Sequence, residues 1–213
     1  MPLLGAAALA MWWDMAPEVR DEFEEWHSHE HLPERLALAG FRRGSRWRSA
    51  DGGDGFFVMY ELDDHATLTS PGYLARLNDP TPWSRRMMPH HRNMVRSQCR
   101  VLESAGGGIG GAMLTLRLSP AAGRDESLRG FLRDAFADFV QRRGIAAAHL
   151  LRTETTAAAA TTEQKIRGND AAADWIALLS GYDLDAMREA AGTCLAGMTT
   201  AGASSHPEPG SYR

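Results

Sequence analysis

The first half of the chain is organised around one segment, Pro17 to Phe41, which reads PEVRDEFEEWHSHEHLPERLALAGF. A proline followed by several acidic residues is typical of a helix N-terminus, because the helix dipole favours negative charge there. Val19, Phe23 and Trp26 share one face of that helix. We therefore expect a helix that packs an aromatic stripe against a core.

The end of this segment predicts where the helix gives way to a strand. Pro33 lacks an amide hydrogen and clashes with the carbonyl oxygen four residues earlier, so the helix should kink or stop near His31 or Leu32. This would place His31 at a helix end. Gly40 then precedes Phe41–Arg48, where bulky and charged residues alternate as a strand requires.

The residues outside this segment extend the pattern to β-α-β-β-α-β. A short apolar run before the helix predicts a strand, and a glycine-rich turn after Phe41–Arg48 predicts a hairpin. A second helix, a short helical turn and a fourth strand follow. The expected elements are strands Leu9–Met15, Phe41–Arg48, Phe56–Leu62 and Val95–Leu102, and helices between Asp63 and Leu77 and around Arg85 to Met88.

The second half repeats this order. With a shift of 104 residues, Arg20-Asp21-Glu22 aligns with Arg124-Asp125-Glu126 and Gly40-Phe41 aligns with Gly144-Ile145. We expect a first repeat over residues 1–104, a glycine-rich joint over 105–111 and a second repeat over 112–213. The second repeat carries an Ala/Thr-rich insert at 155–169 with no period of its own, and an irregular C-terminal tail. Its expected elements are strands Met113–Leu118, Ile145–Thr153, Trp175–Ser180 and Gly210–Arg213, and helices Glu126–Arg143 and Leu184–Ala191.

Two tandem ferredoxin-like units resemble the dimeric α+β barrel superfamily, with both halves of the barrel supplied by one chain. The run His27-Ser28-His29-Glu30-His31-Leu32-Pro33-Glu34-Arg35, followed by Gly40-Phe41, resembles the EthD-like branch. The resemblance implies the α+β fold class, with two tandem ferredoxin-like (β-α-β-β-α-β) repeats forming an α+β barrel. The superfamily hosts monooxygenases, lactone isomerases, polyketide cyclases and haem-degrading enzymes, so it does not decide the reaction.

Composition excludes several classes of function. A net charge of −4 and a pI of about 6.1 give no basic surface for nucleic acid. The longest apolar stretch, Leu3 to Trp13, has eleven residues, well short of the roughly 20 that a membrane-spanning helix needs. Cys99 and Cys194 form no CxxC pair, which indicates a reducing, cytoplasmic location. No GxGxxG motif joins a strand to a helix, and we expect no cofactor.

His27 and His31 are the candidate catalytic residues. They lie four residues apart on one helix face, and a histidine in a pocket can act as a general acid or base near neutral pH. The alternative is that both cap carbonyl groups at a frayed helix end, where the dipole would favour the imidazolium form of His31. His27, Glu30 and His31 also match the inverted zincin pattern, but Pro33 disturbs that turn and no third protein ligand stands out, so we expect no metal.

Aromatic residues on two expected strands could line a pocket. Phe41 and Trp47 share one face of their strand, while Trp12 and Trp13 point to opposite faces of another. Aromatic walls with few polar groups suit an aromatic or polyketide-like ligand. The same spacing also fits a plain hydrophobic core, and the sequence leaves both interpretations open.

A cationic segment in an acidic chain provides the remaining candidates for substrate binding, which are Trp83, Arg85, Arg86 and His91. Guanidinium groups bind carboxylates and enolates with two parallel hydrogen bonds, so the arginines could hold an anionic substrate. The alternative is that they neutralise the acidic first helix at an interface.

These residues support two hypotheses of different classes. The first is a small enzyme that uses no cofactor and performs acid/base chemistry on a small organic acid or an aromatic, polyketide-like compound. The second is a non-catalytic ligand-binding or accessory protein of a catabolic pathway. Both require a small-molecule ligand, and the sequence does not decide between them. A role in handling haem would additionally need an axial histidine that faces a cavity of barrel size.

We predict that the chain forms a homodimer. The short last strand would leave a sheet edge unpaired, and such edges are usually covered by a partner. Analytical ultracentrifugation at micromolar concentration should show a dimer, and a single monomeric species would contradict this prediction.

Overall fold

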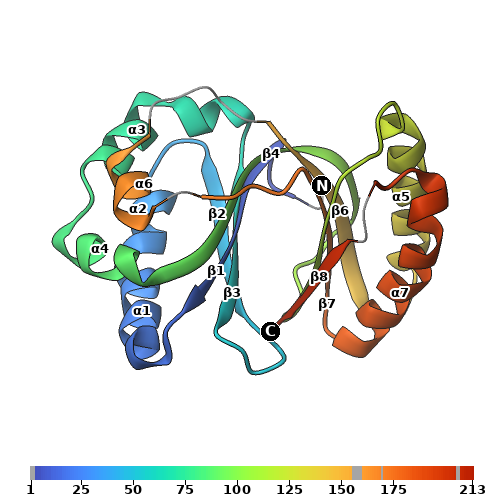
Figure 1. Cartoon of the computed structure of the whole chain (residues 1–213), viewed down its shortest axis with the longest axis horizontal. Helices are drawn as coiled ribbons and strands as arrows, with labels where there is room; N and C mark the ends of the chain where they lie inside the picture. Colours follow the sequence, from blue (N-terminus) through green and yellow to red (C-terminus); the bar gives the residue numbers. More distant parts are fainter. Residues whose placement is uncertain (1–2, 155–159, 169, 205–206) are drawn as a thin grey trace.

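The computed structural model describes residues 3–154, 160–168, 170–204 and 207–213. Its strands form one eight-stranded antiparallel sheet in the order β2-β3-β1-β4-β6-β7-β5-β8. Two groups of helices cover the sheet on opposite sides of the molecule (Figure 1). Within the described ranges, no helix combines the length and hydropathy that crossing a bilayer requires.

The elements follow the chain with few interruptions. The first half holds β1 (Ala7–Met15), α1 (Arg20–Trp26), a π-helical turn (His27–His31), α2 (Leu32–Leu36), β2 (Phe41–Arg48), β3 (Gly55–Leu62), α3 (Pro71–Asn78), α4 (Pro82–Met87) and β4 (His91–Gly106), with short 3-10 turns at Pro17–Val19, His65–Thr69 and Met88–His90. The second half holds β5 (Ala112–Leu118), α5 (Asp125–Phe139), β6 (Ile145–Thr153), α6 (Thr162–Arg167), β7 (Trp175–Gly181), α7 (Leu184–Ala201) and β8 (Glu208–Tyr212).

The two halves share one strand order. The first half arranges its strands as β4-β1-β3-β2 and the second as β8-β5-β7-β6, so the fourth strand lies beside the first in each. This confirms the α+β class and the ferredoxin-like order. Strand β4 is longer than expected because one end pairs with β1 and the other end pairs with β6, which joins the halves into one sheet. It extends to Gly106, inside the expected joint.

The two outer strands of the sheet also meet. The backbone amide of Arg48 donates to the carbonyl oxygen of Arg213 at 2.7 Å, and the reverse bond is equally short. Ser49 and Tyr212 form an antiparallel bridge beside them. The edge that the dimer prediction assumed to be unpaired is thus paired along these residues, and the homodimer stays a prediction.

Three apolar clusters hold the layers together. One lies under the first helix group and one under the second, while the third lies between the halves and draws Trp12, Trp47 and Phe57 from the first half and Ile176 and Leu178 from the second. The ring centroids of Trp12 and Phe57 are 4.9 Å apart, and those of Trp47 and Phe57 are 5.6 Å apart. Each such pair contributes about 1 kcal/mol beyond the burial of its surface.

The expectation that Phe41 and Trp47 share one face of β2 is wrong. A β-bulge between Phe41 and Arg43 shifts the register against β3. An inserted residue reverses the side to which every earlier side chain of the strand points. Phe41 therefore packs with Tyr60 and Tyr73 under the first helix group, whereas Trp47 enters the cluster between the halves.

The expected helix end at His31 is also wrong, because the helical path continues to Leu36. The turn His27–His31 is π-helical, and the amide of Leu32 donates to the carbonyl oxygen of His27, five residues back. A π turn is wider than an α turn, so it gives the Pro33 ring room and needs no amide from it. The histidines consequently lie within a continuous helical run.

Several other element bounds differ from the expectation. The second helix divides at Pro71, because Asp64 caps a 3-10 turn and Ser70 caps α3. Helix α5 ends at Phe139 rather than Arg143, and α7 continues to Ala201 rather than Ala191. The insert contains α6, although its sequence shows no helical period; its residues 155–159 and 169 lie outside the described ranges.

The junction of the halves allows a test with two adjacent glycines. Gly106 has φ +79°, and a Cβ there would lie 2.2 Å from the carbonyl oxygen of Ala146. At Gly107, a Cβ would meet no atom within 4 Å. Gly106→Ala should therefore lower the free energy of unfolding by about 2 kcal/mol or more. Gly107→Ala should change it by no more than about 0.5 kcal/mol. Urea unfolding measures both values, and equal midpoints would contradict the strain at Gly106.

Candidate functional site

Three histidines gather between the first helix group and the sheet. His27 and His31 come from the π-helical turn, and His91 comes from the first residue of β4. The ring centroids of His27 and His31 are 5.5 Å apart. The indoles of Trp13 and Trp26 flank them, with centroid distances of 5.0 Å from Trp13 to His91 and 4.5 Å from Trp26 to His31. The site therefore combines imidazole nitrogens with flat aromatic walls.

The local sequence explains this placement. Trp13 points toward the helices because the pleat sends Trp12 to the opposite face of β1. The π turn projects His27 and His31 toward the same side of the helical run. A π turn within a helix is frequently found at a functional site.

Among the described residues, the hydrogen bonds leave two buried ring nitrogens of this group without partners. The Nδ1–H of His91 donates to the carbonyl oxygens of Met87 and Met88, both at 3.2 Å. A neutral imidazole that donates at Nδ1 carries its lone pair on Nε2. The Nδ1 atoms of His27 and His31 are buried and have no partner among the described residues. Buried polar atoms are usually paired, so these two nitrogens are notable.

Burial holds all three imidazoles in the neutral form. It lowers the pKa of His27 and His31 well below the ordinary value of 6.5, and nearby Arg46 and Arg35 respectively lower the pKa values further. Burial lowers the pKa of His91 to about 3, with Arg167 adding to the effect. A neutral imidazole can accept a proton, and the lowered pKa values also make these rings weaker bases than a histidine in water.

A cavity of about 20 Å³ lies at the centre of this group. It is lined by Met11, Trp13, Trp26, His27, His31, Met88, His91, Met94 and Arg167. That volume suffices for one water molecule. The arrangement is therefore a small hollow between imidazole, indole and methionine side chains.

Helix α6 belongs to the second half but closes the site of the first half, where it lies beside α2 and α3 (Figure 1). Arg35 of α2 and Glu163 of α6 form an ion pair, and both side chains are only 3% exposed. Arg167, one turn after Glu163, is 8% exposed and lines the cavity. Sequence reasoning missed this helix, although Thr161 and Gln164 form a capping box that could have revealed its start.

The other predicted site residues lie elsewhere. Trp47 is in the cluster between the halves, and Phe41 lies under the helices without lining the cavity. The structure thus brings together His27, His31 and His91, and separates them from these aromatic residues.

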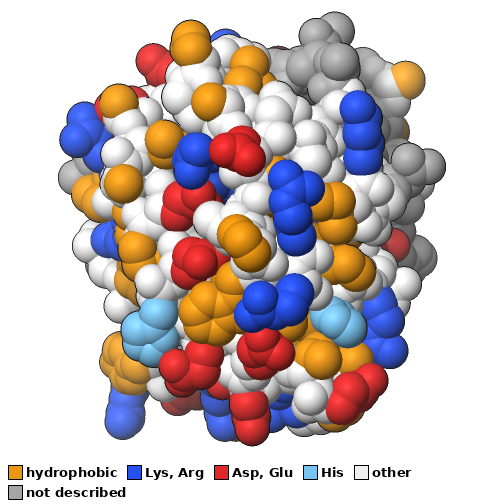
Figure 2. Space-filling view, turned by 90° about the vertical axis from the view of Figure 1, so that its left-hand side faces the viewer, with side chains coloured by type: hydrophobic (Ala, Val, Ile, Leu, Met, Phe, Trp, Pro, Cys, Tyr) orange, Lys and Arg blue, Asp and Glu red, His pale blue; other side chains and the backbone are white. Residues whose placement is uncertain are grey.

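The cationic segment lies toward the outside of the first helix group. The indole Nε1 of Trp83 donates to Glu22 at 3.0 Å, Arg86 also contacts Glu22 at 3.4 Å, and Arg85 donates to the carbonyl oxygen of Pro80 at 3.1 Å. Acidic and basic side chains are interspersed over this face (Figure 2). These contacts favour charge neutralisation of α1 by Arg86 over binding of an anionic substrate.

The alternative interpretation is that the histidines cap carbonyl groups of the helix, and His29 is the one that does so rather than His27 or His31. Nδ1 of the exposed His29 contacts the carbonyl oxygen of Glu25 at 3.1 Å. The carboxylate of Glu30 accepts hydrogen bonds from Trp26 and Thr81, away from a zincin arrangement. Among the residues that the structure describes, no three His, Cys, Asp or Glu side chains are arranged so that they could hold a metal ion, the three histidines included.

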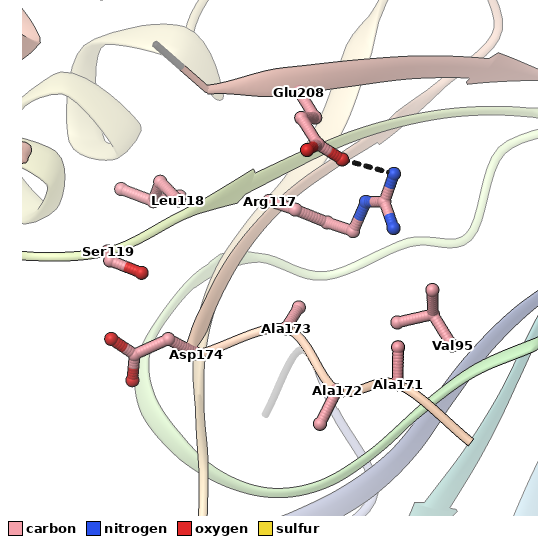
Figure 3. Close-up of a pocket in the computed structure, with 9 residues that line it drawn as sticks. All are labelled: Val95, Arg117, Leu118, Ser119, Ala171, Ala172, Ala173, Asp174 and Glu208. Atoms are coloured by element: carbon pink, nitrogen blue, oxygen red, sulfur yellow. Dashed lines mark ion pairs between the residues drawn. The ribbon is translucent and has the colours of Figure 1, made fainter. Parts of the chain in front are cut away.

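A second hollow of about 300 Å³ lies between the halves (Figure 3). Arg117 and Glu208 form an ion pair on one side of it, and Ala171, Ala172 and Ala173 line the other side. The Arg117 guanidinium also lies 5.7 Å from the ring centroid of Trp12. The lining of this hollow includes no histidine, so its chemistry differs from that of the histidine cavity.

Comparisons with known proteins place the fold but not the reaction. No protein-family model matches the chain, and no curated protein matches it. A solved structure described as an anthrone oxidase-like protein is similar over 97% of this chain and 90% of that one, with a TM-score of 0.67 and 16% identity. The structure of a candidate monooxygenase from Fusobacterium nucleatum is similar over 99% of this chain and 93% of that one, with a TM-score of 0.65 and 7% identity. The structure of a haem-binding protein from Thermus thermophilus is similar over 98% of this chain and 92% of that one, with a TM-score of 0.54 and 11% identity. At these identities the likeness shows the fold alone.

The neutral histidines make stability depend on pH. Their folded pKa values lie below the unfolded value of 6.5, so the unfolded chain binds more protons and stability is lost as the pH falls below that value. We expect the free energy of unfolding to fall less steeply with pH in His31→Gln than in the unmodified protein. Between about pH 6 and pH 5, the difference in slope should be about 1 kcal/mol per pH unit. Urea unfolding across this range measures the slope.

His29→Gln is the matched control, because His29 lies on the same helical run but is exposed. The slope measured for this variant should stay steeper than the slope measured for His31→Gln. Equal slopes for both variants would show that His31 does not remain neutral in the folded state.

Proposed function

We propose that this chain is an enzyme without a cofactor that transfers a proton on a small aromatic or polyketide-like compound, with His31 and His27 as general bases. The observation that carries the proposal is the pair of neutral imidazoles whose buried Nδ1 atoms have no partner among the described residues. Trp13 and Trp26 beside them suit a flat ring.

We further propose that residues 1–104 and 112–213 are repeats of one unit, linked by 105–111, that close an α+β barrel of the EthD-like branch. The common strand order, the bonds between Arg48 and Arg213 and the apolar cluster shared by the halves support it. Trp12, Trp47 and Phe57 occupy part of the space between the halves, and the lining of the hollow beside them offers no histidine as an axial ligand, which does not fit a haem there.

The cavity must widen to admit such a substrate. Met88 and Met94 line it, and methionine side chains change conformation readily because they are long and unbranched. When the substrate binds, these side chains move aside and its ring occupies the space that they leave. In the reaction, a C–H or O–H bond breaks, the proton passes to an imidazole nitrogen, and the electron pair stays on the substrate as an enolate or phenolate.

Anthrone is a suitable probe, because its methylene protons are acidic and a similar structure is described as anthrone oxidase-like. The protein should accelerate exchange of these protons for deuterium in buffered D₂O without oxygen, as followed by mass spectrometry. His31→Gln should lower the catalysed rate by about 100-fold or more, since this is the usual contribution of a general base. His27→Gln should also lower it.

His29→Gln again serves as control and should retain the full rate. Quenching of tryptophan fluorescence measures binding of anthrone separately. Binding without exchange above the buffer rate would contradict the enzyme and support the alternative, a ligand-binding or accessory protein.

A further inference from the structure

We propose that Arg167, supplied by α6 of the second half, is the anion-binding residue of the histidine cavity, and that the ligand is an aromatic acid whose carboxylate pairs with this guanidinium. This inference deepens the proposed function, because it assigns the substrate class of the same cavity. It also gives a function to α6, which lies in the insert that has no counterpart in the first half.

Arg167 has donor capacity that the described contacts do not use. One terminal nitrogen donates to Asp170 at 2.9 Å, and the other lies 3.7 Å from Glu163, beyond hydrogen-bond distance. The Nε atom is buried without a partner among the described residues. Burying a guanidinium donor unpaired is unfavourable, so a ligand oxygen at this nitrogen would be stabilised.

Three arginines lie near the histidines, and two of them are already paired with carboxylates, Arg35 with Glu163 and Arg167 with Asp170. The charged side chains that shift the pKa values of His27, His31 and His91 are Arg46, Arg35 and Arg167, and each lowers them. The neutral histidines add no negative charge, so a ligand anion would compete for Arg167 with the carboxylate of Asp170. A ligand carboxylate suits the unpartnered Nε of Arg167, because guanidinium forms strong charge-assisted hydrogen bonds with carboxylates.

Helix α6 makes the molecule asymmetric. In the second half, the corresponding layer under α5 and α7 is an apolar cluster built around Leu132, Phe136 and Met187. The cavity with histidines and Arg167 occurs under the first helix group. The inference therefore predicts one aromatic acid bound per chain, rather than one per half.

Isothermal titration calorimetry on the full chain tests the inference. The two ligands are 2-naphthoate and its neutral analogue 2-naphthamide. The unmodified protein should bind one naphthoate per chain, and Arg167→Met should weaken that binding at least tenfold while leaving naphthamide binding unchanged. Lys165→Met is the matched control, because it removes a positive charge from an exposed position of the same helix. It should leave both affinities unchanged.

Asp170→Asn separates ligand binding from a merely structural role. It removes the carboxylate that now bonds to Arg167, so naphthoate should bind more tightly if the guanidinium receives the ligand. If the Arg167–Asp170 pair only holds α6 in place, Asp170→Asn should instead weaken binding as Arg167→Met does, which would overturn the inference. Failure of the unmodified protein to prefer naphthoate over naphthamide would also overturn it.

The test is independent of catalysis. Naphthoate binding that depends on Arg167, together with no exchange of anthrone, would support the anion site and reject the proposed enzyme. Exchange that depends on His31, together with equal naphthoate affinities for Arg167→Met and Lys165→Met, would support the enzyme and reject the anion site.

Discussion

The ion pair of Arg35 and Glu163 is the contact on which the histidine site depends, because it holds α6 beside the first helix group. It joins α2 of the first half to α6 of the second, across 128 positions of sequence. Both side chains are almost completely buried, so their desolvation must be offset by their mutual attraction and by further partners such as Glu34, 3.2 Å from Arg35. Removing one member of such a pair usually costs about 3–5 kcal/mol, because the other charge stays buried.

This constraint explains how one fold carries two different layers. Both halves follow the same strand order and place helices outside the sheet. The layer under α5 and α7 is apolar, while the layer under α1 contains His27 and His31. Because the insert crosses to the first half, it covers polar groups there and leaves the second half with a plain core. A shared fold thus supports a polar site on one side alone.

The histidine site is partly predictable from the sequence. The spacing of His27 and His31 reveals them, since four residues along a helix return to the same face. His91 is a candidate because it lies in a cationic segment, although its real setting is a buried one beside Trp13. Arg167 escapes sequence reasoning because α6 is short and lies in an Ala/Thr-rich stretch. The sequence also misplaces Trp47 relative to Phe41, because a β-bulge has no reliable sequence signal.

Local sequence patterns are enough to predict the order of the strands, the α+β class and the helix face that carries the histidines, because periodicity, prolines and glycines act through local geometry. They do not predict how Pro33 is accommodated, since a π turn depends on what packs around it. The meeting of residues from β1, β4, the π turn and α6 at one cavity is a product of tertiary packing. Contacts between distant segments depend on packing and charge pairing in three dimensions, and the ion pair of Arg35 and Glu163 exists only once both halves have folded.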